Sequence, residues 1–111
     1  MSLSDLYNIL NSIEGFKGKI AYRMFPVNEA PTLPYICFLE TNTTNFKADG
    51  KVYRKIQNFD IELYTLNKDT KSEELIENAL NDNDIAWDKY EEYIEDEHCY
   101  EIVYEITIQG E

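Results

Sequence analysis

Two segments of the chain place apolar residues at the spacing of an amphipathic helix, residues 3–14 and residues 71–82. Apolar side chains three and four positions apart share one side of a helix, where they can pack on a core. These residues are Leu3, Leu6, Tyr7, Leu10 and Ile13 in the first segment, and Leu75, Ile76, Ala79 and Leu80 in the second. Residues able to cap the helix N-termini are Ser2 or Ser4 in the first segment and Thr70 or Ser72 in the second.

Five other segments have the pattern of β-strands: residues 20–25, 35–43, 52–66, 85–93 and 100–108. Alternation of apolar and polar residues places the apolar ones on a single face of a sheet. In the third segment the alternating residues are Phe59, Asp60, Ile61, Glu62 and Leu63. In the last, one face is expected to carry Ile102, Tyr104, Ile106 and Ile108, and the other Glu101, Val103, Glu105 and Thr107.

The expected order of elements is α-β-β-β-α-β-β within a single domain of residues 1–111, a length typical of one domain. Runs of strands joined by short turns favour an α+β fold with two helices packed on a mostly antiparallel sheet. Asp49-Gly50 is a strong turn signal, so the strands on either side of it are expected to form a long projecting hairpin.

The charge is divided unevenly along the chain. Residues 1–72 carry nine Lys and Arg against eight Asp and Glu, whereas residues 73–111 carry only Lys89 against 14 acids. Aromatic and Ile residues are interspersed among these acids, unlike in a disordered acidic tail. The C-terminal third is therefore expected to fold and to present one strongly anionic face.

A net charge of −12 disfavours some partners. Binding to nucleic-acid phosphates or to an anionic membrane depends on Lys and Arg, so we expect neither as a partner. A basic protein surface remains open as a partner.

No catalytic signature accompanies the acids. His98 lies in a predicted surface turn, the carboxylates of residues 91–97 do not fit a calcium-binding loop, and there is no phosphate-binding or nucleophile motif. Cys37 and Cys99 lie in apolar runs and are expected to be buried thiols, and a disulfide between them would need their strands to be neighbours. We expect no enzyme activity, no cofactor and no metal site.

The predicted hairpin is the only locally basic stretch, with Lys47, Lys51, Arg54 and Lys55 in its sequence. A basic arm and an acidic C-terminal face on one chain suggest head-to-tail association of copies, which closes into a ring if the rotation permits. The alternative is an ordinary hairpin that makes no contact with another copy. The candidate interface residues are Phe46, Lys47, Asp49, Lys51 and Tyr53 on the hairpin, and Glu95, Asp96 and Glu97 on the acidic side.

Several blocks resemble the small tail-assembly proteins of long-tailed bacteriophages and of prophages in Gram-positive bacteria. The blocks are Leu33-Pro34-Tyr35-Ile36, Asn45-Phe46-Lys47-Ala48-Asp49, Val52-Tyr53, Ile61-Glu62-Leu63-Tyr64-Thr65, the helix with Glu74 and Leu80, Tyr93-Ile94-Glu95-Asp96-Glu97 and Tyr100-Glu101. The resemblance covers roughly residues 30–108 and contains no catalytic motif.

The resemblance implies a non-enzymatic tail-terminator or tail-completion protein of the head–tail neck. Proteins of that kind have an α+β fold and form a ring, usually hexameric, that caps the tail tube and docks on the head connector. The expected partners are then further copies of the chain, the tail-tube protein and head-connector proteins. The expected location is the bacterial host cytoplasm during assembly and the virion neck afterwards.

Three alternatives stay open from the sequence. The chain fits another neck or minor capsid component, or an acidic inhibitor that mimics DNA and occupies a basic groove of a host enzyme. The concentration of acids in one third of the chain argues against the mimic, which needs acids spaced along an extended surface. A small hydrolase that uses the carboxylates with a divalent metal would need a buried pair with perturbed pKa values.

Overall fold

The computed structural model describes residues 1–48 and 50–110, and the side chains of residues 44–48, 51–54 and 110 lie outside the described part. Its elements are α1 (Leu3–Asn11), β1 (Ile20–Tyr22), β2 (Tyr35–Ala48), β3 (Lys51–Thr65), α2 (Thr70–Asp82), β4 (Trp87–Ile94), the 3₁₀ turn η1 (Glu95–Glu97) and β5 (Cys99–Gly110). Within these residues two α-helices accompany a five-stranded, mostly antiparallel sheet, which confirms the α+β class.

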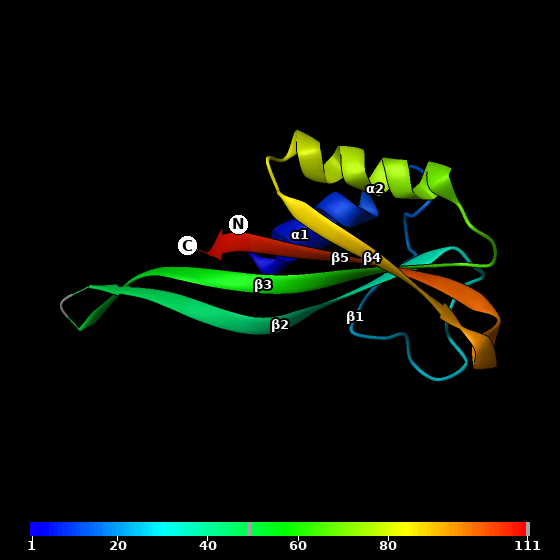
Figure 1. Cartoon of the computed structure of the whole chain (residues 1–111), viewed down its shortest axis with the longest axis horizontal. Helices are drawn as coiled ribbons and strands as arrows, with labels where there is room; N and C mark the ends of the chain where they lie inside the picture. The colour runs from blue at the N-terminus through cyan, green and yellow to red at the C-terminus, as the bar shows by residue number, and fades with distance from the viewer. Residues whose placement is uncertain (49, 111) are drawn as a thin grey trace.

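The strands lie in the order β1-β2-β3-β5-β4, as Figure 1 shows. β1 runs parallel to β2, and every other neighbouring pair is antiparallel. The order in the sheet departs from the order along the chain because β5 returns between β3 and β4. α2 connects β3 to β4, so β4 lies at one edge of the sheet and β5 in its interior.

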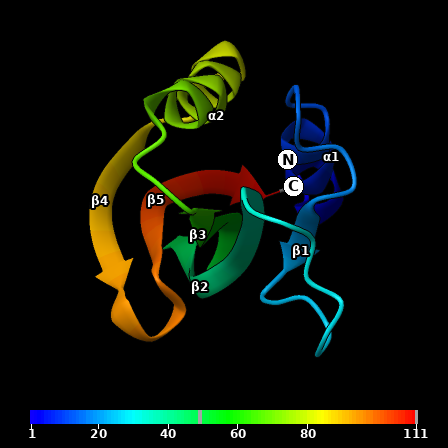
Figure 2. The ribbon, with the colours of Figure 1, turned by 90° about the vertical axis from the view of Figure 1, so that its right-hand side faces the viewer.

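Both helices lie on the same side of the sheet, which curves around them (Figure 2). The core joins apolar residues of α1 and α2 to every second residue of the strands. Its largest fully buried members are Leu6, Leu10, Phe16, Ile36, Phe38, Phe59, Ile61, Leu63, Ile76, Leu80, Ile102 and Tyr104. The predicted alternation of β5 is confirmed, since its four predicted core residues are buried in this cluster.

Two elements end three residues earlier than their patterns predict. α1 ends at Asn11 because the chain then turns tightly, with the Ile13 N–H donating to the Leu10 carbonyl at 3.2 Å. β1 ends at Tyr22 because Arg23 takes a φ of 69°, a left-handed conformation that leaves the extended path. The strand predicted over residues 20–25 therefore covers only residues 20–22.

Other ends differ for local reasons as well. The strand predicted over residues 35–43 continues to Ala48 in β2, and a bulge between Glu40 and Asn42 takes up the extra residue. The N-cap of α2 is Asp69 rather than Thr70 or Ser72, and its carboxylate accepts the Ser72 N–H at 3.0 Å.

The hairpin of β2 and β3 is longer than the rest of the sheet. Lys55 of β3 faces Gly110 at the end of β5, so residues 51–54 pair with β2 alone. This two-stranded end lies at one extreme of the molecule, which measures 50 × 28 × 24 Å, and η1 lies toward the other (Figure 1).

An ion network joins α2 to β4 on the helix side of the sheet. The Lys89 ammonium donates to Glu73 at 3.0 Å and to Glu77 at 2.7 Å, and Lys68 lies 2.7 Å from the other oxygen of Glu73. Burial raises the pKa of Glu73, but the hydrogen bonds from Lys68 and Lys89 outweigh it and hold that pKa below its ordinary value. The buried carboxylate therefore stays charged and ties the helix to the sheet.

We expect Lys89→Met to lower the free energy of unfolding by about 2 kcal/mol, because it leaves Glu73 with one cation and Glu77 with none at this position. Lys71→Met, on the exposed surface of the same helix, is the matched control and should cost under about 0.5 kcal/mol. Urea unfolding at neutral pH measures both values. Equal losses for the two variants would contradict this role for the network.

Candidate functional site

The face of the sheet away from the helices carries a set of acidic side chains, and we call it the open face. Its carboxylates are Asp60 and Glu62 on β3, Glu101 and Glu105 on β5, and Asp88 and Glu92 on β4. The strand register places them in neighbouring rows, with Glu105 between Asp60 and Asp88, and Glu101 beside Glu92. Alternation along β3 and β5 causes this, because Ile61, Ile102 and Tyr104 point to the opposite side and fill the core.

Two of these carboxylates share one tyrosine. The Tyr64 hydroxyl lies 3.2 Å from Glu62 Oε1 and 2.9 Å from Glu101 Oε2. The hydroxyl has a single proton, so it donates to one carboxylate at a time, and the other contact is a hydrogen bond only when that carboxyl is protonated. The geometry therefore favours one proton held between Glu62 and Glu101.

The electrostatics of the open face agree with that arrangement. Burial, and then the charge of Glu101, raise the pKa of Glu62 to about 7. Burial and the charge of Glu105 also raise the pKa of Asp60. Like charges on adjacent strands disfavour each other's ionised forms, and the Tyr64 hydrogen bond lowers the pKa of Glu62 by less than burial and Glu101 raise it.

Cations lie elsewhere among the residues that the structure describes. The ion pairs there join Lys68 and Lys89 to Glu73, Glu77 and Glu91, and none includes a carboxylate of the open face. Arg23 is at the margin of the face, in the loop after β1.

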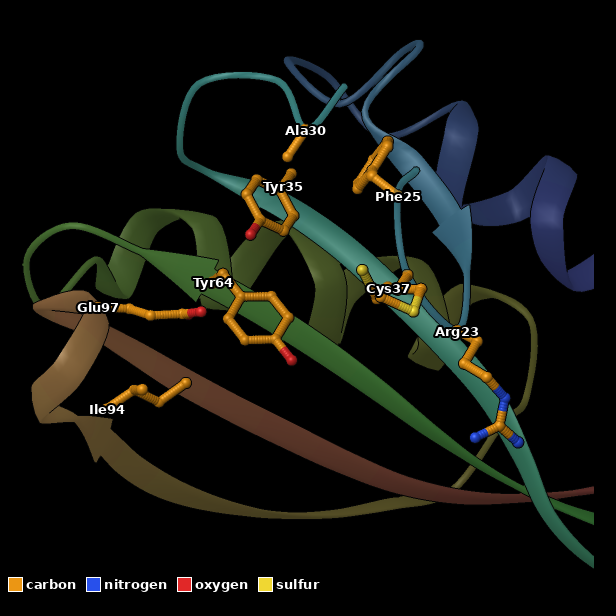
Figure 3. A pocket seen from close by; sticks show the side chains of 9 residues that line it. Arg23, Phe25, Ala30, Tyr35, Cys37, Tyr64, Ile94 and Glu97 are labelled. Carbon is orange, nitrogen blue, oxygen red and sulfur yellow. The ribbon is translucent and has the colours of Figure 1, made fainter. Parts of the chain in front are cut away.

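A cavity of about 370 Å³ opens at the end of the open face nearest η1. Figure 3 shows Tyr35 from β2, Tyr64 from β3 and Glu97 from η1 around it, with Arg23 at its opposite end. The Tyr35 ring lies 5.3 Å from the Tyr64 ring and 5.2 Å from the Phe25 ring, centroid to centroid. The cavity thus has aromatic walls, with a carboxylate at one end and the Arg23 guanidinium at the other.

The structure separates the two groups of predicted interface residues. Glu95, Asp96 and Glu97 form η1 and are exposed, and Glu97 also lines the cavity. The hairpin carries the backbone of Phe46, Lys47, Lys51 and Tyr53, whose side chains lie outside the described residues, as does Asp49 entirely. The two groups lie toward opposite ends of one protomer, so a contact between them requires a second copy.

Sequence reasoning missed Asp60, Glu62, Glu101 and Glu105 as a group. The alternation along each strand does place Asp60 and Glu62 on one face of β3, and Glu101 and Glu105 on one face of β5. This alternation was the sequence signal that could have identified the group. Their proximity depends on the pairing of β3 with β5, which the order of elements does not reveal.

The cysteines and the possible metal ligands were the other candidates for chemistry. Cys37 and Cys99 are both buried free thiols, as expected, and burial followed by the charges of Glu62 and Glu101 raises the pKa of Cys37 to about 11. A thiol with such a pKa is a poor nucleophile at neutral pH. Over the described residues, no group of three or more His, Cys, Asp and Glu is placed to hold a metal ion.

No protein-family model matches the chain, and no curated protein sequence matches it. In the part of the chain that the structure covers, neither helix has the length and apolar character needed to cross a membrane.

We expect Glu62→Gln to stabilise the protein at pH 8 more than at pH 5. The pKa of Glu62 is raised in the folded state, so the folded protein holds the proton of this carboxyl more tightly than the unfolded chain does. The resulting contribution to the free energy of unfolding is complete below about pH 4.5 and is lost as the pH rises through about 7. Glutamine cannot ionise, and its advantage should grow by about 1 to 2 kcal/mol over that range, after allowance for solvent screening.

Urea unfolding of wild type and variant at the two pH values measures this difference. Glu92→Gln is the control, because it removes the same charge from an exposed position of the same face. An advantage of Glu62→Gln that does not change with pH would contradict the shared proton.

Proposed function

We propose that the chain is a non-enzymatic structural protein that associates head to tail with copies of itself, in the manner of a tail-terminator or tail-completion protein at the head–tail junction of a phage. The observation that carries this proposal is the separation of charge along one elongated protomer. A basic hairpin lies at one end, and an acidic sheet face and acidic turn lie along the rest.

The distance between the basic and acidic ends prevents them from interacting within one protomer. Exposed charges more than about 8 Å apart are largely screened at physiological salt, and the protomer is 50 Å long. The basic hairpin therefore cannot neutralise η1 of its own chain. Each end is left to attract the opposite end of another copy, and such complementarity steers association and fixes register.

The hairpin projects beyond the rest of the sheet, so we propose that it is the arm that contacts the next copy. A contact between two different surfaces of identical chains is heterologous, so it produces a ring when the rotation closes and a filament when it does not. We propose the ring, and with it the tail-tube protein and the head-connector proteins as further partners in the virion neck. Another neck or minor capsid component would use the same association.

A second candidate function draws on the open face. Asp60 and Glu62 come from outside the acidic C-terminal third and join it on one surface, which extends the anionic area available to an acidic inhibitor of a nucleic-acid enzyme. Capture of a host nuclease or polymerase by the purified chain, without binding to tail-tube protein, would favour that role.

We expect the wild-type chain to form species larger than a monomer at high protein concentration or on added tail-tube protein. The double variant Lys47→Glu/Lys51→Glu should weaken this association by roughly tenfold or more, because it reverses the charge of the hairpin. Lys17→Glu/Lys71→Glu makes the same change of net charge on exposed residues elsewhere and should have an effect under about twofold. Sedimentation velocity measures the populations.

A wild-type chain that stays monomeric under all these conditions, and binds neither tail-tube nor connector protein, would refute the proposal. Equal weakening by the two double variants would show that net charge, rather than the hairpin, controls association.

A further inference from the structure

We infer that the open face is the surface that receives the basic hairpin of the next copy, and that the cavity at its end accepts one of the hairpin's Lys or Arg side chains. This inference rests on the proposed self-association and names the acceptor surface within it. The acceptor is thus a half-buried sheet face, in place of the exposed acids of η1 alone.

The first support is that the open face is unpartnered. Both helices pack on the other side, and Asp60, Glu62 and Glu101 are half-buried without a Lys or Arg partner in the described part of the chain. Half-buried carboxylates that repel one another gain more from an added cation than fully solvated ones, because less water screens the attraction. A neutral or acidic partner would leave them desolvated and unpaired, which costs free energy.

The second support is the condition of the hairpin. Beyond Lys55 it consists of two strands, and over the described residues no third strand pairs with them. A two-stranded ribbon is at best marginally stable in water unless it packs against something. Its sequence supplies Lys47, Lys51 and Arg54 against the single acid Asp49, which is complementary to the open face.

The third support is the chemistry of the cavity. A Lys or Arg side chain has an apolar stem and a charged tip, and the two ends prefer different surroundings. The rings of Tyr35 and Tyr64 line the cavity beside the stem and the cation, and the Glu97 carboxylate, at the end away from Arg23, offers a counter-charge.

The donor must be another copy. The cavity lies at the end of β3 that carries Tyr64, and the hairpin turn lies at the other end of this 15-residue strand. At about 3.3 Å per residue the two are separated by roughly 45 Å along the strand. A chain cannot fold its own hairpin back over that distance while the strand remains paired.

Zero-length cross-linking with a carbodiimide tests the contact on the full-length chain, because this reagent joins only an amine and a carboxylate that touch. An equal mixture of ¹⁴N and ¹⁵N protein at high concentration separates links between copies from links within one copy in the mass spectrum. We expect mixed-isotope links from Lys47 or Lys51 to Glu62, Glu101 or Glu97. Lys17 and Lys71 serve as internal controls and should not link to these carboxylates.

A pair of complementary variants provides a second, independent readout. Glu62→Gln/Glu101→Gln should weaken self-association by roughly tenfold, whereas Glu74→Gln/Asp82→Asn, with the same charge change on the exposed side of α2, should change it by less than about twofold. Mixing the open-face variant with the Lys47→Glu/Lys51→Glu variant should give a dimer and nothing larger, because each mixture partner retains one intact surface. Thermal unfolding checks that both variants remain folded.

The outcomes separate this inference from the proposed function. Hairpin links to Glu95 and Asp96 alone, with undiminished association of Glu62→Gln/Glu101→Gln, would overturn the open face as acceptor and leave head-to-tail assembly standing. Links to the open face in particles that never exceed a dimer would support the acceptor and count against a ring. No hairpin links between copies at all would overturn both.

Discussion

The antiparallel pairing of β3 with β5 is the constraint on which the rest of the structure depends. It joins Phe59 to Ile106, Ile61 to Tyr104 and Leu63 to Ile102, and these residues form the centre of the core. The same register fixes the opposite face, where Asp60 meets Glu105 and Tyr64 meets Glu101. A shift of one residue would exchange the two faces and bury the acids, so the apolar pattern that builds the core also creates the acidic surface.

The acidic open face costs free energy in the isolated protomer. Six carboxylates on one side of a sheet repel each other, and a proton held near Glu62 at neutral pH relieves only part of that repulsion. On the helix side the situation is reversed, since Glu73 is buried but held between Lys68 and Lys89. The contrast between compensated acids beneath the helices and uncompensated acids on the open face suggests that the open face has a cationic partner.

Sequence reasoning reached the α+β class, with two helices and a mostly antiparallel sheet, and the acidic character of the C-terminal third. Periodicity is local information, and it was sufficient for α2 and for the alternation of β5. It could not locate the end of β1, which depends on the backbone conformation of Arg23, nor the N-cap at Asp69, which depends on a competition among adjacent polar residues. Neither could it bring Glu62 to Glu101, because that contact depends on which strands become neighbours. The proposed site was therefore predicted as acidic, but its acceptor residues were placed on η1.

The central claim is that opposite charges on different copies drive association, and its salt dependence tests that claim most directly. Sedimentation velocity at high protein concentration, from about 50 mM to about 500 mM salt, covers the range in which screening of surface charges becomes strong. We expect larger species at low salt that dissociate progressively as salt is added. Association that is unaffected or strengthened by salt would contradict it, since that result would indicate an apolar contact in place of the charged one.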